Sequence, residues 1–145
     1  MPPDDPHAHI ASIDVAAPAD QAYAFMADGM AQTYWALGSW DRRDEGDGLF
    51  SGTSLFDGRR LYVRLDGDPA RRLVDYRVGH SPDELRHCVQ ARVMPGEELG
   101  LGPDACIVTL VAWRLPEQDA EGWALIHHAF KTEVHLIRAR IEGRL

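Results

Sequence analysis

The sequence predicts an α+β fold, in which an antiparallel sheet is combined with two short helices near its start and one long helix at its end. Three observations predict this class. Apolar and polar residues alternate with the period of strands between Trp40 and Leu115. The pair Asp57-Gly58, typical of hairpins, separates two of these segments, and residues 123–142 repeat apolar side chains with helical period. Arginines on one face of the strands indicate a sheet with one side in water and the other covered.

The chain has 145 residues, a length that suits one domain with its own core or with a small-molecule cavity. With 45% hydrophobic and 26% charged residues, its composition is that of a globular protein. Residues 1–8 combine prolines with aspartates before any periodic pattern begins, so we expect them to form a mobile tail. A single domain is expected over residues 9–145.

The charge balance and the cysteine content limit the partners and the location. The net charge of −8 disfavours binding to nucleic acid and to anionic membranes, because both need a basic surface. No apolar run is long enough to insert into a membrane, and the first ten residues lack the pattern of a signal peptide, so a cytoplasmic location is expected. Cys88 and Cys106 are expected to be buried free thiols, and the sequence leaves open whether they lie close together.

The first elements are one strand followed by two short helices. Residues 9–15 alternate as a strand. Residues 17–28 form the first helix, in which Pro18 suits the first turn. Residues 30–37 form the second short helix.

The middle of the chain is read as a meander of strands, whose most apolar member, residues 105–115, is expected to be central. Tyr76 is predicted to face inward, whereas Tyr62 and Arg64 are predicted to face outward. Trp113 is compatible with either direction. The acidic stretch 41–48 superficially resembles a calcium loop, but Arg43 stands where a ligand is needed, so we interpret it as an exposed turn. The other strand segments are residues 48–58, 59–69, 71–79 and 87–96.

The last helix presents a broad apolar stripe to the sheet. His128 and His135 fall on the opposite side and are expected to be solvated. The two histidines are seven residues apart, about 10 Å along the axis, too far for one ion, so no metal site is predicted. The stripe consists of Trp123, Ile126, Phe130, Val134, Ile137 and Ile141, widened by Leu125, Ala129 and Leu136.

Glu133 differs from its neighbours, because the residues three and four positions away on both sides are all apolar. A carboxylate in such a place must reach a partner or water, or its pKa must shift. One interpretation places it at the edge of the stripe, where it extends to water or pairs with a strand arginine. The other makes it a polar group that lines a cavity. Arg140 lies on the same side two turns later, and His127 borders the apolar side near the start of the helix.

This order of elements resembles the helix-grip fold of the START and birch-pollen-allergen superfamily, also called SRPBCC or polyketide cyclase/dehydrase-like. The similarity rests on the opening "IDVAAPADQAYAFMAD", on "TYWALGSW" after it, and on the strand "CIVTLVAWRL" before the final helix. The resemblance implies a seven-stranded antiparallel sheet curling around the last helix, with an apolar cavity between them. Members bind lipids, hormones or polyketides, some catalyse cyclisation or dehydration, and others are chaperone cofactors. They share no catalytic residue set, so no catalytic residue is carried over.

On this basis a START-like cavity that binds a small apolar molecule is the leading hypothesis. Tyr34 and Trp35 are expected near the cavity mouth, although they suit equally well the role of plugging the open end of the sheet. No cofactor is implied. The candidate ligand-binding residues are Tyr34, Trp35, Tyr76, Ile126, His127, Phe130, Glu133 and Ile137.

Two other functions stay open. One is a cyclase- or dehydratase-like enzyme with Glu133 or His127 as proton carrier and Tyr34 or Tyr76 nearby. The other is an interaction module, co-chaperone-like or half of a toxin–antitoxin-like pair, which would show a solid core and a large apolar surface patch. A homodimer through the exposed face of the last helix also stays open. The sequence does not name the ligand.

Overall fold

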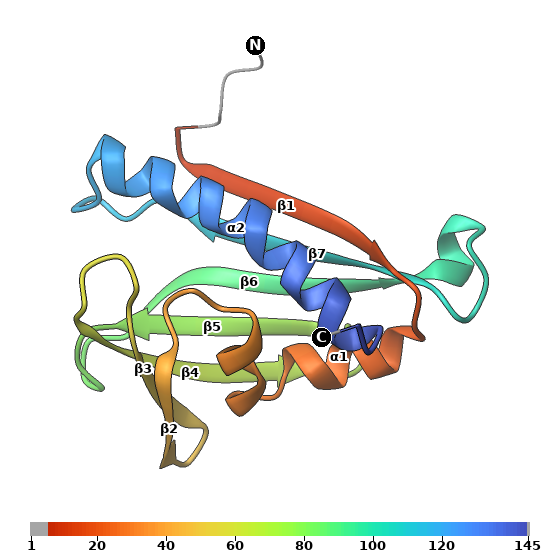
Figure 1. The fold of residues 1–145 in the computed structure, drawn as a ribbon, viewed down its shortest axis with the longest axis horizontal. Coiled ribbons are helices and arrows are strands. Elements are labelled where there is room, and N and C mark those ends of the chain that lie inside the picture. Colours follow the sequence, from red (N-terminus) through yellow and green to blue (C-terminus); the bar gives the residue numbers. More distant parts are fainter. Residues whose placement is uncertain (1–5, 145) are drawn as a thin grey trace.

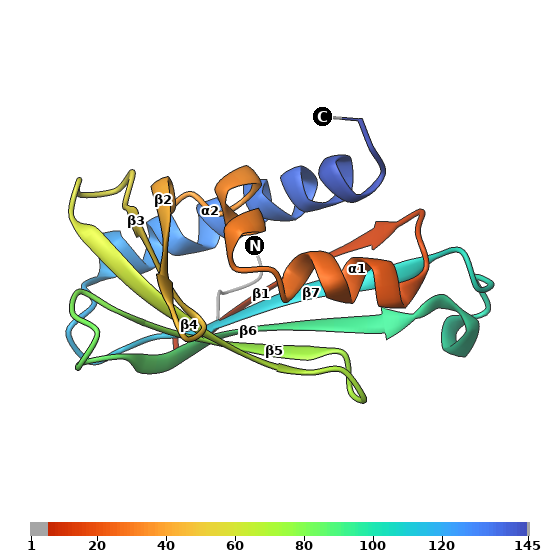
Figure 2. The same cartoon turned by 90° about the horizontal axis from the view of Figure 1, so that it is seen from below.

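The computed structural model describes residues 6–144, which form a seven-stranded antiparallel sheet curled around a long C-terminal helix (Figure 1). The strand order is β1-β7-β6-β5-β4-β3-β2. The first strand of the chain therefore lies at one edge of the sheet and pairs with the last strand, β7. The helices gather on one face of the sheet, as Figure 2 shows. This arrangement confirms the predicted α+β helix-grip fold and its seven strands.

The seven strands pair in register along most of their length. β1 and β7 pair without interruption, from Ala8 opposite Trp113 to Val15 opposite Cys106. The strands are β1 (Ala8–Val15), β2 (Trp40–Gly46), β3 (Leu49–Thr53), β4 (Arg60–Asp68), β5 (Leu73–Gly79), β6 (Arg86–Pro95) and β7 (Cys106–Trp113).

The helices are α1 (Ala19–Met26), the 3₁₀ turns η1 (Met30–Tyr34) and η2 (Gly96–Leu99), and α2 (Ala120–Ile141). The second short helix is therefore shorter than predicted. Trp35 leaves helical geometry at φ −137°, and the Ser39 side chain bonds backbone carbonyl oxygens, which competes with continuing the helix. α2 begins earlier than predicted because the Asp119 side chain accepts a hydrogen bond from the Gly122 N–H at 2.8 Å.

The predictions for the start of the chain and for the start of the meander need correction. β1 starts at Ala8, inside the predicted mobile tail, and residues 1–5 of that tail lie outside the described residues. The stretch 41–48, interpreted as an acidic turn, belongs mainly to the edge strand β2. Its side chains do not alternate in polarity because nearly all of them are exposed. The tight turn itself is Asp47-Gly48, where both residues have positive φ.

The core lies between the sheet and the helices and follows the predicted alternation. Tyr76 faces inward as predicted, and His128 and His135 are exposed as predicted. Leu125 is 44% exposed, so it does not widen the apolar stripe. Trp113, whose direction the sequence left open, is 40% exposed.

The two cysteines are free, buried and far apart. Cys106 of β7 lies opposite Pro95, at one end of β6. Cys88 lies on β6, seven residues before Pro95, which places it roughly 20 Å from Cys106 at strand spacing. Cys88 turns inward at a bulge, because the register between β5 and β6 shifts after Tyr76. Within residues 6–144, no helix combines the length and the apolar character that crossing a membrane would require.

Candidate functional site

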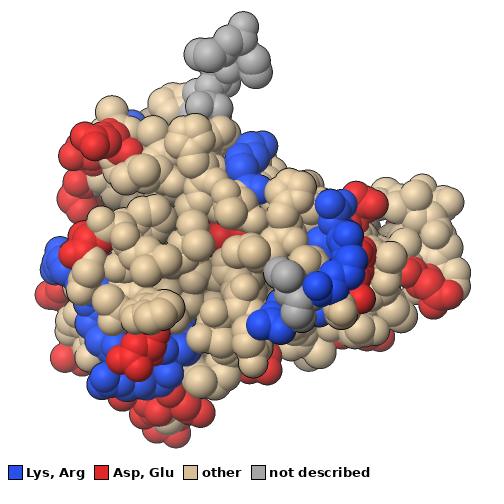
Figure 3. Space-filling view, viewed as in Figure 1, with Lys and Arg blue, Asp and Glu red and all other residues tan. Residues whose placement is uncertain are grey.

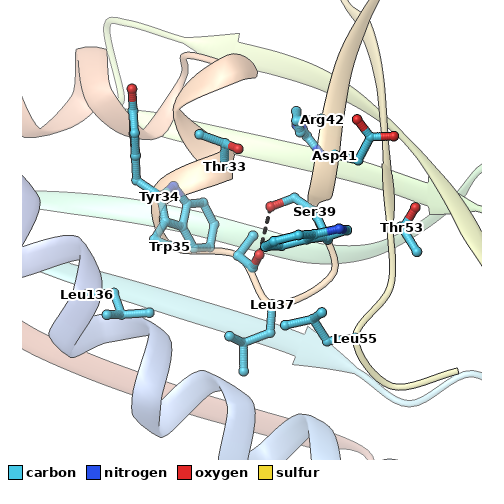
Figure 4. Close-up of a pocket in the computed structure, with 12 residues that line it drawn as sticks. Thr33, Tyr34, Trp35, Leu37, Ser39, Asp41, Arg42, Thr53, Leu55 and Leu136 are labelled. Atoms are coloured by element: carbon cyan, nitrogen blue, oxygen red, sulfur yellow. Dashed lines mark hydrogen bonds between the residues drawn. The ribbon is translucent and has the colours of Figure 1, made fainter. Parts of the chain in front are cut away.

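An open depression of about 870 Å³ lies beside the C-terminal half of α2 (Figure 4). It is formed by η1 and the segment 35–42 that follows, by the β3–β4 loop, and by one residue of α2. The lining residues are Thr33, Tyr34, Trp35, Ala36, Leu37, Ser39, Trp40, Asp41, Arg42, Thr53, Leu55 and Leu136.

The two ends of the depression differ in polarity. In Figure 4, Leu37, Leu55 and Leu136 lie together at one end. Polar side chains, among them Thr33 and Arg42, lie toward the other end. The face of the molecule around α2 and η1 is mainly uncharged, and charged side chains gather toward its margins (Figure 3). The site therefore suits a molecule with an apolar body and a polar end.

The peptide groups of Leu37 connect two sides of the depression. The Leu37 N–H donates to Glu133 Oε2 of α2 at 2.8 Å, and the Leu37 carbonyl accepts from the Leu55 N–H in the β3–β4 loop at 3.2 Å. Ser39 Oγ lies 2.6 Å from the Gln32 carbonyl oxygen and so ties the same segment back to η1. These contacts hold an irregular segment in place against α2.

Glu133 is a buried carboxyl group with only 5% of its surface exposed. It lies beneath segment 35–42, which forms the wall of the depression. No arginine within residues 6–144 pairs with it, which excludes the predicted ion pair with a strand arginine. Burial raises the pKa of Glu133 to about 8, against the opposing effect of the Leu37 N–H. Its Oε1 is buried and has no hydrogen-bond partner among the described residues. At neutral pH the group is therefore mostly protonated.

Trp35 and Tyr76 pack edge to face behind the depression, with ring centroids 6.1 Å apart. The Tyr76 hydroxyl donates to the Met26 carbonyl oxygen at 2.6 Å, and burial raises the pKa of Tyr76 far above its usual value. Tyr76 is thus a fixed core residue. Trp35 lines the depression with only 4% of its surface exposed, and its indole N–H is buried with no partner within residues 6–144.

Tyr34 stands at the rim, 49% exposed, and links η1 to α2. The Arg140 guanidinium lies over its ring, 3.9 Å from the centroid. This cation–π contact joins the rim to the last turns of the helix.

The remaining predicted site residues are not part of the depression. Phe130 and Ile137 are buried in the core, and Ile126 is half-buried against it. His127 is half-buried near the start of α2, with its ring centroid 4.8 Å from that of His9. In turn, His9 stacks on Trp123 at 3.7 Å. In the part of the chain that the structure describes, no three or more His, Cys, Asp or Glu side chains are arranged to hold a metal ion.

The site residues that sequence reasoning missed lie in the loops and edge strands. Leu37, Ser39 and Trp40 belong to the segment "TYWALGSW", whose aromatic content was the available signal. Arg42 was assigned to an exposed turn, and Leu55 to a strand. No periodic pattern marks residues whose place depends on contacts with distant elements.

Comparisons with known proteins agree on the fold. No protein-family model and no curated protein sequence matches the chain. The structure is similar to the Zhui aromatase/cyclase from Streptomyces sp. R1128, with a TM-score of 0.69 and 18% identity over 94% of each chain. It is similar to a START superfamily protein from Mycobacterium smegmatis, with a TM-score of 0.69 and 14% identity over 96% of this chain and 99% of that one.

A third similar structure is the Aha1 dimer from Colwellia psychrerythraea, with a TM-score of 0.67 and 11% identity over 94% of this chain and 97% of that one. The chain therefore has the START and polyketide cyclase-like fold that the sequence resemblance implied. Proteins of different function share this fold, so the likeness defines the architecture and leaves the activity to the site.

Proposed function

We propose that this protein binds a small, mostly apolar molecule in the depression beside α2. The observation that carries the proposal is a concave site of about 870 Å³ in which aliphatic and aromatic side chains meet a few polar groups. This volume and this mixed lining are typical of small-molecule sites. The similarity in fold to a START superfamily protein and to an aromatase/cyclase supports the same proposal.

The proposed site differs in place from the cavity expected between the centre of α2 and the sheet. Phe130 and Ile137 are buried there among other core side chains. The depression touches α2 only through Leu136 and owes the rest of its lining to segment 33–42 and to Thr53 and Leu55. A ligand would therefore enter beside α2.

Filling the depression tests the proposal. We expect Leu136→Trp to block it, because Leu136 is the residue of α2 that lines it. Leu125→Trp is the matched control, since Leu125 is exposed on the same helix, about 16 Å further along the axis. Binding of an apolar fluorescent probe to the three proteins is measured by titration. Loss of binding in Leu136→Trp alone supports the site, and equal binding in all three contradicts it.

Native mass spectrometry of the freshly purified protein gives an independent measurement. A mass of a few hundred daltons that is lost on denaturation would identify the class of bound molecule. A dimer peak without such a mass would favour the interaction module instead. Trp40, Leu55 and Phe56, which are exposed by 68%, 61% and 45%, lie at or next to the depression and offer apolar surface to such a partner.

A second candidate function is catalysis, and the state of Glu133 favours it. A buried carboxyl group with a pKa of about 8 can donate and accept a proton near neutral pH. It lies directly behind Leu37, which lines the depression. His127 is a weaker candidate, because it lies six residues from Glu133, about 9 Å along the helix axis and further from Leu136, the residue of α2 that lines the depression. An enzyme of this kind would lose turnover in Glu133→Gln while retaining ligand binding.

A further inference from the structure

Arg42 is a half-buried cation of β2 that lines the depression. A guanidinium removed from water normally has a carboxylate partner, because an unpaired charge in such a place is costly. Within residues 6–144 no carboxylate lies within salt-bridge distance of Arg42, and its contacts are with neutral groups only. This leaves a positive charge at the wall of an open site without its own counter-ion.

The contacts of Arg42 orient the guanidinium without neutralising it. Its Nε donates to the Gly29 carbonyl oxygen at 2.9 Å, and its Nη2 donates to the side-chain oxygen of Gln32. Its guanidinium carbon lies 5.6 Å from the centroid of the Phe50 ring. The remaining nitrogen, Nη1, has no hydrogen-bond partner among the described residues and is not fully buried. One nitrogen of the guanidinium is therefore left without a hydrogen-bond acceptor in the described part of the chain.

Asp41, the acidic residue next to Arg42 in the sequence, forms ion pairs with two other arginines. Asp41 Oδ2 lies 3.1 Å from Arg43 Nη2 and 3.6 Å from Arg60 Nη1. Arg60 is further occupied by the side chains of Ser51 and Thr53. The charge of Asp41 is thus compensated, and it does not serve as the missing partner of Arg42.

We propose that Arg42 anchors the carboxylate of an apolar ligand, whose body lies toward Leu37, Leu55 and Leu136. This inference rests on the proposed function and names the ligand class: a small aliphatic or aromatic carboxylic acid in its ionised form. A carboxylate would supply the anion that the guanidinium lacks, through a charge-assisted hydrogen bond to Nη1. The opposite end of the depression is lined by leucines and accommodates the apolar part.

A matched ligand pair tests the inference. Decanoate and 1-decanol share the same chain and differ in the charged group, and both are titrated against the full chain by competition with a bound fluorescent probe. We expect decanoate to bind about 10-fold more tightly or better, the range expected for a hydrogen bond between charged groups. Equal affinities would overturn the inference and leave the proposed function standing. Failure of both ligands to bind would contradict the two together.

Variants locate the preference. Arg42→Met should bind both ligands equally, and Arg42→Lys should keep part of the preference because the charge remains. Arg43→Met is the matched control, since Arg43 is the neighbouring arginine, its side chain is 62% exposed, and it does not line the depression. Binding of decanol reports whether each variant keeps a folded site. A preference for decanoate that survives in Arg42→Met would overturn the inference.

A measurement on the unaltered protein covers the case in which Arg42→Met does not fold. The ¹⁵Nε resonance of the Arg42 side chain should shift on addition of decanoate and stay in place on addition of decanol. The resonance of Arg43 should respond to neither. A decanoate-dependent shift at Arg43 without one at Arg42 would place the anion elsewhere and contradict the proposal.

Discussion

The grip of α2 on the sheet and the wall of the depression are built in different ways. The grip consists of periodic apolar side chains, such as Val134 and Ile137, which are almost wholly buried. The wall is an irregular segment held by single polar contacts, among them the one between Leu37 and Glu133. Burial gives the first region its stability, whereas the second depends on a few hydrogen bonds and rings. The wall of the depression is therefore the part of the molecule that a small change can alter without unfolding the rest.

The largest expected effect breaks the grip. Ile137→Ala removes a wholly buried side chain, and we expect the free energy of unfolding to fall by about 2–5 kcal/mol. Leu125→Ala, on the exposed side of the same helix, should change it by less than about 0.5 kcal/mol. Urea unfolding of the two variants measures this difference. Similar losses in the two variants would contradict the assignment of Ile137 to a buried face of α2 and of Leu125 to an exposed one.

The second-largest effect is the pH dependence of the free energy of unfolding, which comes from the proton on Glu133 beneath the wall. Its pKa rises from 4.5 to about 8 on folding, so between these values the folded state keeps a proton that the unfolded state loses. The contribution of this group is complete below pH 4.5 and is lost as the pH rises through about 8. The free energy of unfolding should fall across this window by at most about 1.4 kcal/mol per pH unit.

Glu133→Gln isolates this contribution, because the amide oxygen still accepts from the Leu37 N–H but does not titrate. Urea unfolding at pH 5, 6.5 and 8 should show a steeper loss of stability in the unaltered protein than in the variant. Parallel pH profiles would mean that the carboxyl group is already ionised in the folded protein. Glu133→Leu should also free the wall segment, seen as faster amide exchange at Leu37.

The smallest effect concerns the rim. The contact between Tyr34 and Arg140 should contribute about 0.5–1 kcal/mol, because it lies at a half-exposed position. A double-mutant cycle with Tyr34→Ala and Arg140→Met measures this coupling free energy and separates it from other contacts of Arg140. A coupling close to zero would mean that the rim is not linked to α2 through this pair.

Much of the fold was predictable because a strand or helix with one buried face repeats its apolar residues at a characteristic spacing. The alternation around Val74 and Tyr76 and the helical stripe ending at Ile141 both follow from one covered face, and the structure confirms them. β2 escaped prediction for the same reason, since a strand exposed along nearly all its length shows no alternation. The pair Asp57-Gly58 lies between two paired strands as predicted, although in a longer loop, and the tight turn Asp47-Gly48 lies at the end of the stretch that was interpreted as an exposed turn.

The candidate site was predictable only in part. Tyr34 and Trp35 line the depression, as an aromatic segment after the first helix suggested. Glu133 was singled out by its apolar neighbours, but its actual partner, Leu37, lies 96 residues away in the chain. No local pattern indicates such a pair.

By itself, the sequence determined the order of the elements that have a buried face, the covered face of the sheet and the exposed side of α2, because each depends on the local period of apolar side chains. Only the tertiary structure decided which residues line the depression, that Glu133 keeps its proton near neutral pH, and that the charge of Arg42 has no counter-ion among the described residues. These properties depend on burial and on partners from distant elements. They exist only once the chain has folded and water has been excluded.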